Sequence, residues 1–329
     1  MGGSCHSRRY SASCEGPIPA RSPCGDGVRS GGSAEGWRPV RSNLEKTEDT
    51  IGVRLTVLGS GSAGNATLLQ DGDQRVLIDV GLSYREVVRR LESIGVPAAT
   101  VGAVVITHAH GDHTRGAGLF SRRHEVPVYA TLKTRAIWKG ADVARWGDLQ
   151  CDATTKICGF RFVTFEVSHD AAAETVAFCI ESSNGDIGFA TDLGVVTETL
   201  RTKFRSCRLI VMESNHARDL LQVGPYSQRM KARIAGERGH LSNEELALFV
   251  GKHLGRSVEC LVLAHLSRVN NTPELAAMTC REALDVAGRS DVRVLVAHQD
   301  CVAESVELGL VFHGNPADMH IQRQQTLPF

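Results

Sequence analysis

The sequence predicts an α/β domain built in layers. Short apolar strands and amphipathic helices alternate along the chain, in the order strand, glycine-rich loop, strand, helix, strand. Polar residues that can bind a metal directly follow several of these strands. The length of 329 residues exceeds the usual size of one domain but suits one α/β domain with tails. We therefore expect a single folded domain.

Composition sets the outer limits of this domain. Residues 1–50 are rich in Gly, Ser, Arg and Pro and almost lack periodic apolar positions, so we expect a disordered leader, followed by the domain at 51–313 and a flexible tail at 314–329. Lys plus Arg and Asp plus Glu each number 37, so any nucleic-acid binding must come from a local basic patch. No apolar run is long enough to cross a membrane and no signal-peptide core is evident, which favours a cytoplasmic protein without membrane contact.

The first strands surround a glycine-rich loop. The strand at 53–59 leads into GSGSAGN, residues 59–65, whose backbone amides and Ser60, Ser62 and Asn65 could contact phosphate, although such turns are more often only tight turns. A strand at 75–79 ends at Asp79, which could cap a helix or orient a metal-bound histidine.

Periodicity and capping residues predict the remaining elements. The helix at 83–94 is expected to expose Arg85, Arg89 and Arg90. Further strands are expected at 66–69, 101–106, 127–130, 160–167, 175–181, 187–190, 209–212, 258–264 and 292–297. Further helices are expected at 116–122, 132–138, 197–204, 227–235, 243–254 and 273–287.

The segment THAHGDH, residues 107–113, is the strongest sign of a metal site. It places His108, His110, Asp112 and His113 directly after a predicted strand, which is rare in an ordinary surface loop. We expect a tight loop rather than a helix, with Gly111 permitting the turn. His108 and His110 would then face one cation, and Asp112 and His113 a second.

Three more potential ligands follow other predicted strands. His169 would complete the first set and His265 the second, and the Asp192 carboxylate could offer one oxygen to each cation. The alternatives are a structural histidine in each case and an ordinary turn aspartate. Two cations lower the pKa of a bridging water, so the set predicts metal-assisted hydrolysis. Zinc is the first expectation, and such ligands also accept manganese or iron.

His240 has the setting of a proton donor. It precedes a helix whose cap is predicted from Ser242 and Glu245, and the amino end of a helix favours an anion. His240 could protonate a leaving oxygen there, or it could only stabilise the turn. Four basic residues could contact phosphate or could only be exposed charges: Arg229, Lys231, Arg233 and Arg268.

These motifs together resemble the metallo-β-lactamase fold. Its ordered motifs match Asp79, THAHGDH, His169, Asp192 and His265 within residues 53–311. The resemblance implies a four-layer αββα sandwich. GSGSAGN, SHD, ATDLG, ESNH, GHLSN and HLSRVNN resemble the YycJ/WalJ branch, bacterial proteins regarded as 5′ to 3′ DNA exonucleases of repair or replication, and ribonuclease Z is a more distant parallel.

The resemblance also implies roles for further residues. Glu213 would hold His240 as the proton donor, Asp112 would be catalytic as well as a ligand, and Asp170 would orient a ligand. Arg268 and Asn270 of HLSRVNN would contact substrate. DNA is favoured over RNA. The alternatives are an RNA-processing or cyclic-nucleotide phosphodiesterase of the same fold and, in another class, a non-enzymatic metal-binding accessory protein.

The last six residues, QQTLPF, fit the pattern Q-x-x-L-x-F through Gln324, Leu327 and Phe329. This pattern resembles the peptide by which bacterial repair and replication proteins bind the sliding clamp. A disordered tail without a partner is equally consistent with the sequence.

Overall fold

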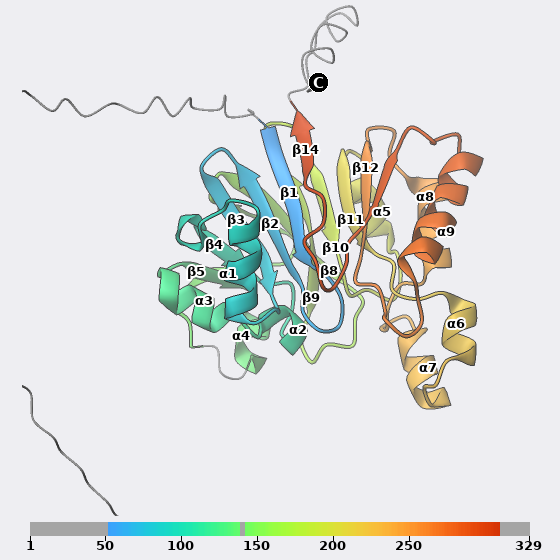
Figure 1. The fold of residues 1–329 in the computed structure, drawn as a ribbon, viewed down its shortest axis with the longest axis horizontal. Coiled ribbons are helices and arrows are strands. Elements are labelled where there is room, and N and C mark those ends of the chain that lie inside the picture. Colours follow the sequence, from blue (N-terminus) through green and yellow to red (C-terminus); the bar gives the residue numbers. More distant parts are fainter. Residues whose placement is uncertain (1–51, 139–141, 310–329) are drawn as a thin grey trace, which may run out of the picture. The chain divides into compact units, whose positions relative to one another are not determined.

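A computed structural model describes residues 52–138 and 142–309. The predicted leader and the predicted clamp peptide lie outside these residues. Within them, two sheets face each other and helices cover the outer face of each sheet (Figure 1). The described chain is therefore the four-layer αββα sandwich that the resemblance implies.

The first sheet joins the first described strand to the last one. Its seven strands lie in the order β14 (Val306–Gly309), β1 (Gly52–Gly59), β2 (Ala66–Asp71), β3 (Gln74–Val80), β4 (Ala103–Val105), β5 (Pro127–Ala130) and β6 (Arg145–Asp148). The pairs from β14 to β3 are antiparallel, and those from β3 to β6 are parallel.

The second sheet has the same size. Its order is β13 (Arg293–Val296), β12 (Cys260–Ala264), β11 (Leu209–Glu213), β10 (Ile187–Ala190), β9 (Thr175–Glu181), β8 (Phe160–Val167) and β7 (Ala153–Ile157). The pairs from β13 to β10 are parallel, and those from β10 to β7 are antiparallel.

Three clusters of buried apolar side chains hold the layers together. One lies between the sheets and includes Phe162 and Phe178, which meet edge to face. A second joins the first sheet to its helices through Leu91 and Phe120. The third joins the second sheet to its helices, among them through Phe249.

The helices follow the two sheets in sequence. Those of the first half are α1 (Tyr84–Ser93), the 3₁₀ helix η1 (Ala98–Thr100), α2 (Gly111–Thr114), α3 (Ala117–His124) and α4 (Leu132–Ile137). Those of the second half are α5 (Glu198–Phe204), α6 (Arg218–Val223), α7 (Gln228–Ile234), α8 (Asn243–His253) and α9 (Pro273–Val286). None of the described helices is long and apolar enough to cross a membrane.

Most predicted elements are confirmed within a few residues, and six elements were missed: the strands β6, β7 and β14, the helices α2 and α6, and the 3₁₀ helix η1. The strands β5, β8, β9 and β10 have the predicted bounds. The missed strands β6, β7 and β14 are edge strands of four or five residues. Half of β6 is exposed and β7 is rich in threonine, so neither shows an apolar pattern. The missed helix α6 has only six residues.

The predicted loop conformation of THAHGDH is wrong at its end. Asp112 and His113 lie in α2, a single helical turn. Gly111 does not need to be glycine, because a Cβ there would meet nothing within 4 Å. The required glycine is Gly81, where a Cβ would lie 1.5 Å from the carbonyl oxygen of Asp112. Gly81 thus allows β3 and α2 to approach closely and fixes the position of α2.

The prediction that Arg90 is exposed is also wrong. The side chain is buried, and its Nη1 donates to the carbonyl oxygens of Leu58 at 2.6 Å and Gln299 at 3.0 Å. Its Nε donates to Glu86 at 2.6 Å. Arg90 therefore ties α1 to the end of β1, where the glycine-rich loop begins.

Candidate metal centre

The chemically reactive residues lie at one edge of the sandwich because their strands point the same way. Strand pairing makes β1, β3 and β4 parallel in the first sheet, and β8, β10, β11 and β12 parallel in the second. The carboxyl ends of parallel strands meet at the same edge of a sheet. The segments that follow these seven strands therefore converge, although as many as 205 residues separate Ser60 from His265, which are joined by a 2.7 Å hydrogen bond.

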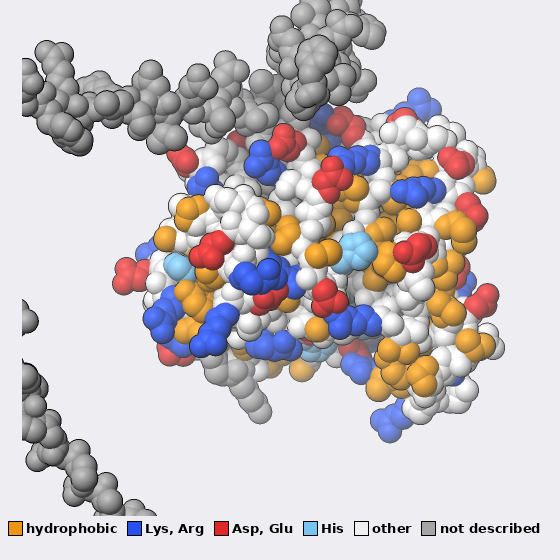
Figure 2. Space-filling view, in the orientation of Figure 1, with side chains coloured by type: hydrophobic (Ala, Val, Ile, Leu, Met, Phe, Trp, Pro, Cys, Tyr) orange, Lys and Arg blue, Asp and Glu red, His pale blue; other side chains and the backbone are white. Residues whose placement is uncertain are grey.

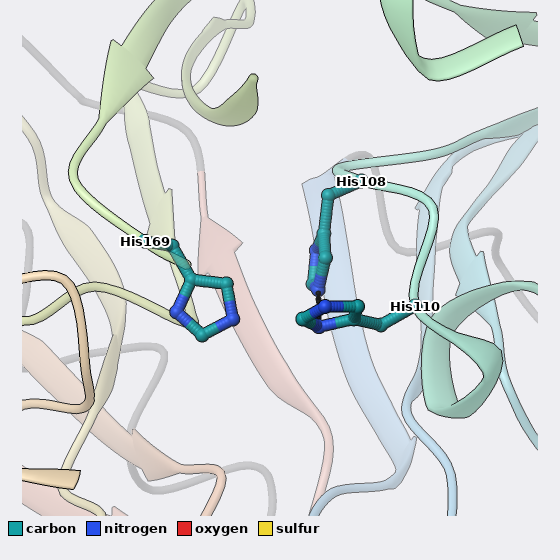
Figure 3. Close-up of side chains that lie close together, drawn as sticks. All are labelled: His108, His110 and His169. Carbon is teal, nitrogen blue, oxygen red and sulfur yellow. Dashed lines mark hydrogen bonds between the residues drawn. The ribbon is translucent and has the colours of Figure 1, made fainter. Parts of the chain in front are cut away.

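The first group of potential ligands comprises His108, His110 and His169. His108 Nε2 lies 3.0 Å from His110 Nδ1, and His169 approaches both rings from the second sheet, at centroid distances of 5.3 and 5.2 Å (Figure 3). One nitrogen from each ring can reach a common point. His169 Nδ1 donates to the carbonyl oxygen of Gly239 at 3.0 Å, so its Nε2 keeps a lone pair that can bind a metal ion.

The second group comprises Asp112, His113 and His265. Asp112 Oδ2 lies 3.6 Å from Nε2 of each histidine. Asp192 lies between the groups, with Oδ2 3.1 Å from His113 Nε2 and Oδ1 3.7 Å from His169 Nε2. The structure thus brings together all seven predicted ligands, in the two sets that the sequence analysis proposed.

Unsatisfied atoms in this cluster fit a divalent cation. His169 Nε2, His265 Nε2 and Asp192 Oδ2 are buried and have no hydrogen-bond partner among the described residues. Each such atom is costly unless something binds it. Imidazole nitrogens and carboxylate oxygens are the ligands that zinc, manganese and iron accept. The residues present therefore fit a divalent metal ion.

Buried partners fix the orientation of the candidate ligand His113. Asp79 Oδ2 lies 2.7 Å from His113 Nδ1, and Asp79 Oδ1 accepts the Thr107 amide at 2.9 Å. Burial would lower the pKa of His113, but the carboxylates of Asp192 and Asp79 raise it well above its ordinary value. A negative cluster that raises the proton affinity of a histidine also attracts a cation.

Three strand-end residues adopt an unusual backbone conformation. The backbone φ angles of Asp79, Asp192 and His265 are 58°, 57° and 54°. These values lie in the left-handed region, which residues other than glycine rarely adopt. Such residues cost about 1–3 kcal/mol each and cluster at functional sites. The conformation turns these side chains from the strand ends into the cluster.

Glu213 connects the cluster to the candidate proton donor. Its fully buried Oε1 lies 2.8 Å from His240 Nδ1 and 2.7 Å from His265 Nδ1. Its Oε2 accepts the amides of Leu193 at 2.9 Å and Leu241 at 3.1 Å. Burial would raise the pKa of Glu213, but His240 and His265 lower it to about 2. Both imidazoles therefore donate through Nδ1 to a carboxylate and keep Nε2 for other partners.

A cavity of about 550 Å³ lies beside His240, between α6, α7 and α8. His216, which the sequence analysis did not select, lines it and has a buried Nδ1 without a partner in the described part of the chain. Burial lowers the pKa of His216. Its position after β11 resembles that of the other strand-end histidines, so the same signal could have found it.

The predicted substrate-binding residues divide into two kinds. Ser60 and Asn65 are buried and their side chains accept hydrogen bonds from backbone amides, so these side chains support the loops. Asn270 is also buried, but its Oδ1 has no hydrogen-bond partner among the described residues. Ser62 is exposed, and Arg268 is exposed and paired with Asp300. Gln299, which no sequence signal indicated, holds the glycine-rich loop through Ala63 and Gly64, each at 2.7 Å.

Most of the predicted phosphate-contacting cations already have partners. Arg233 pairs with Asp170, whose other oxygen lies 3.6 Å from His169 Nε2. Lys231 Nζ donates to the carbonyl oxygen of Gln222 at 2.5 Å. Arg229 is exposed and has no ion pair within residues 52–138 and 142–309. On the face shown in Figure 2, basic and acidic side chains lie side by side, in keeping with the zero formal charge.

Comparison with known proteins identifies relatives over most of the described chain. Residues 74–266 match the family described as the beta-lactamase superfamily domain. The chain is 30% identical to the Bacillus anthracis protein named exodeoxyribonuclease YycJ, over 72% of this chain and 91% of that protein. It is 32% identical to exodeoxyribonuclease WalJ of Streptococcus pneumoniae, over 70% and 87%.

More distant likenesses agree with this family. Ribonuclease Z of Mycobacterium marinum is 40% identical over 73 residues, which are 20% of this chain and 25% of that protein. The crystal structure of the metallo-β-lactamase fold protein YhfI from Bacillus subtilis superimposes with a TM-score of 0.60 at 17% identity, over 78% of this chain and 99% of that one. The likeness to YhfI shows the fold alone.

Proposed function

This chain belongs to the beta-lactamase superfamily domain family and, within it, to the YycJ/WalJ family, and we propose that it is a DNA exonuclease of repair or replication. It is a metallo-β-lactamase-fold hydrolase. The names of its YycJ and WalJ relatives support DNA as the substrate. The proposal includes 5′ to 3′ cleavage and a cytoplasmic location, the compartment that holds bacterial DNA.

The observation that carries the proposal is the contact between Glu213 and His240 beside the ligand cluster. Burial would lower the pKa of His240, but the Glu213 carboxylate raises it. The imidazole lines the 550 Å³ cavity, so a protonated Nε2 can donate to the oxygen that leaves the phosphorus. Phosphodiester hydrolysis needs such a donor because an unprotonated alkoxide is a poor leaving group.

The residues that would hold two divalent cations are the seven ligands described above, with zinc as the first choice and manganese or iron as alternatives. Cations bound there would polarise the scissile phosphate and lower the pKa of an attacking water. In the chain itself, Asp79 and Glu213 orient His113 and His265. Asp112, whose side chain is partly exposed, would be the carboxylate that accepts a proton from an attacking water.

An activity panel tests this function. The substrates are 5′-labelled duplex DNA, single-stranded DNA, precursor tRNA and a cyclic dinucleotide, each with and without a chelator. We expect chelator-sensitive DNA cleavage that D112N abolishes. Cleavage of the tRNA or the cyclic dinucleotide with no cleavage of DNA would overturn the DNA assignment in favour of the corresponding alternative. Absence of any hydrolysis by metal-loaded protein would leave the accessory-protein alternative.

The role of His240 has its own test. H240A is expected to lower turnover by about 10²–10⁴-fold and to retain the metal content of the wild type. H298A makes the same change at an exposed histidine and is the matched control. Loss of a metal from H240A would make His240 a ligand rather than a proton donor.

Clamp binding is a separate part of the proposal and depends on residues outside the described structure. Replacing Leu327 and Phe329 with alanine should abolish retention of the protein on an immobilised bacterial sliding clamp. Undiminished retention of the double variant would refute this part and leave the nuclease proposal untouched.

A further inference from the structure

We infer that a groove along α8 binds the DNA strand at a distance from the bond that is cut. A basic cluster at its far end, formed by Arg201, Arg205, Lys252 and Arg256, contacts backbone phosphates. The inference rests on the proposed function and goes beyond it, because it assigns a binding surface outside the ligand cluster.

The basic cluster lines a hollow of about 570 Å³ between α5 and the end of α8. Among the residues that line it, Glu198 is the one acid, and it is already 3.2 Å from Arg201. Arg205, Lys252 and Arg256 are exposed and have no ion pair or side-chain hydrogen bond within the described chain. Unpaired cations gathered in a hollow produce a local positive potential that attracts anions.

Shared residues connect this hollow to the catalytic edge. A smaller hollow of about 170 Å³ lies between the two larger ones. It shares Arg201 and Lys252 with the basic cluster, and Val195 and Glu245 with the cavity beside His240. The three hollows therefore adjoin one another along α8, from the cavity between α6, α7 and α8 to the hollow between α5 and the end of α8, and together they form the groove.

The length of α8 sets how much substrate the groove can hold. The helix has 11 residues and begins three residues after His240, so its rise of 1.5 Å per residue makes the groove about 16 Å long. Phosphates of one strand of a duplex are about 3.4 Å apart along the axis, so the cluster lies about five nucleotides from the cut. A cyclic dinucleotide could not span this distance.

The character of the groove favours contacts with the backbone over contacts with bases. Phe249, between the basic cluster and the cavity, is buried and cannot stack on a base, so the exposed imidazole of His253 is the one ring in these two hollows that could. Leu248 is 47% exposed and offers only an apolar surface. Arginine and lysine side chains that contact the phosphates bind DNA whatever its base sequence is. This suits an exonuclease, which must advance through any sequence.

Charge reversal tests the groove. R205E/K252E/R256E reverses three unpaired cations of the basic cluster. R85E/R123E/K156E is the matched control, because these three exposed cations lie outside the groove and also lack ion pairs in the described chain. For each variant we would measure hydrolysis of bis(4-nitrophenyl) phosphate, KM for a short DNA of two nucleotides and for DNA of about twenty nucleotides, and binding of the longer DNA to chelator-treated protein between about 50 and 200 mM salt.

The groove variant should hydrolyse bis(4-nitrophenyl) phosphate and the short DNA like the control. For the longer DNA its KM should rise about tenfold or more, and the slope of log affinity against log salt should fall by about 2–3. Equal KM and equal salt slopes for the two triple variants would overturn the inference. If the wild type cleaved no DNA, the proposed function would fail, whereas the binding measurement on chelator-treated protein would still decide whether the groove holds DNA.

Discussion

Replacing Glu213 with glutamine changes the hydrogen bonding of the candidate site while keeping its shape. The wild-type carboxylate accepts four hydrogen bonds, two at each oxygen. A glutamine amide has one oxygen and one NH₂ group. With the NH₂ in place of Oε2, the amides of Leu193 and Leu241 lose their acceptor. With the NH₂ in place of Oε1, His240 and His265 lose theirs as long as each ring keeps its proton on Nδ1 and leaves Nε2 free.

Either orientation leaves two buried donors without an acceptor, and each costs about 1–3 kcal/mol. E213Q should therefore be destabilised by about 2–6 kcal/mol. Its Tm should fall by about 4 °C or more, since 1 kcal/mol corresponds to about 2–4 °C in a domain of this size. Loss of the carboxylate behind His265 should also weaken metal binding by about 10–100-fold.

Three measurements test these effects: calorimetry gives Tm, metal analysis after dialysis against limiting zinc gives metal binding, and hydrolysis of bis(4-nitrophenyl) phosphate gives turnover. E92Q makes the same chemical change at an exposed glutamate of α1 and should stay within about 0.5 kcal/mol of the wild type. If E213Q kept the Tm, metal content and turnover of the wild type, Glu213 could not be the residue that organises the site.

Three further predictions concern a close approach, an ion pair and the metals. G81A should lower Tm far more than G111A does, because a Cβ at residue 81 would lie 1.5 Å from the Asp112 carbonyl oxygen, whereas one at residue 111 meets nothing within 4 Å; equal Tm values would contradict this packing. Hydrogen bonds from Arg89 and Arg90, opposed by burial, lower the pKa of Glu86 from 4.5 to about 2. The wild type should therefore exceed E86Q in stability by up to about 1 kcal/mol above pH 4.5. This difference should disappear as pH falls towards 2, and a constant difference in acid denaturation curves would refute it. Chelation should abolish hydrolysis and added zinc or manganese should restore it, whereas activity that survives exhaustive chelation would exclude metal-assisted hydrolysis.

The ligand cluster could be predicted because its signal is local in the sequence. His169 and His265 each follow a strand that shows a clear apolar pattern, and THAHGDH follows another. Parallel strands then bring distant strand ends to one edge, so sequence position and fold class together predict proximity. The two edge strands β6 and β7 escaped prediction because they bury little apolar surface and leave no periodic pattern.

The residues that support the site could not be predicted, because their partners are far away in the sequence. Gln299 holds the glycine-rich loop across 235 residues, and nothing in its own neighbourhood indicates this contact. Arg90 reads as one of three exposed arginines on a helix until its contact with the Leu58 carbonyl oxygen is known. Gly81 is required by the backbone of Asp112, which local sequence cannot reveal.

The pairing of Gly52 with Gly309 has a consequence for how the protein could be tethered. These two residues are register partners on β1 and β14. The candidate site lies at the other end of β1, whose eight residues span about 26 Å. Gly309, the last described residue, therefore lies at the sheet edge opposite the candidate site (Figure 1). A fluorescent label, a surface anchor or a partner attached at Gly309 itself would therefore join at the opposite edge and leave the candidate site open to its substrate.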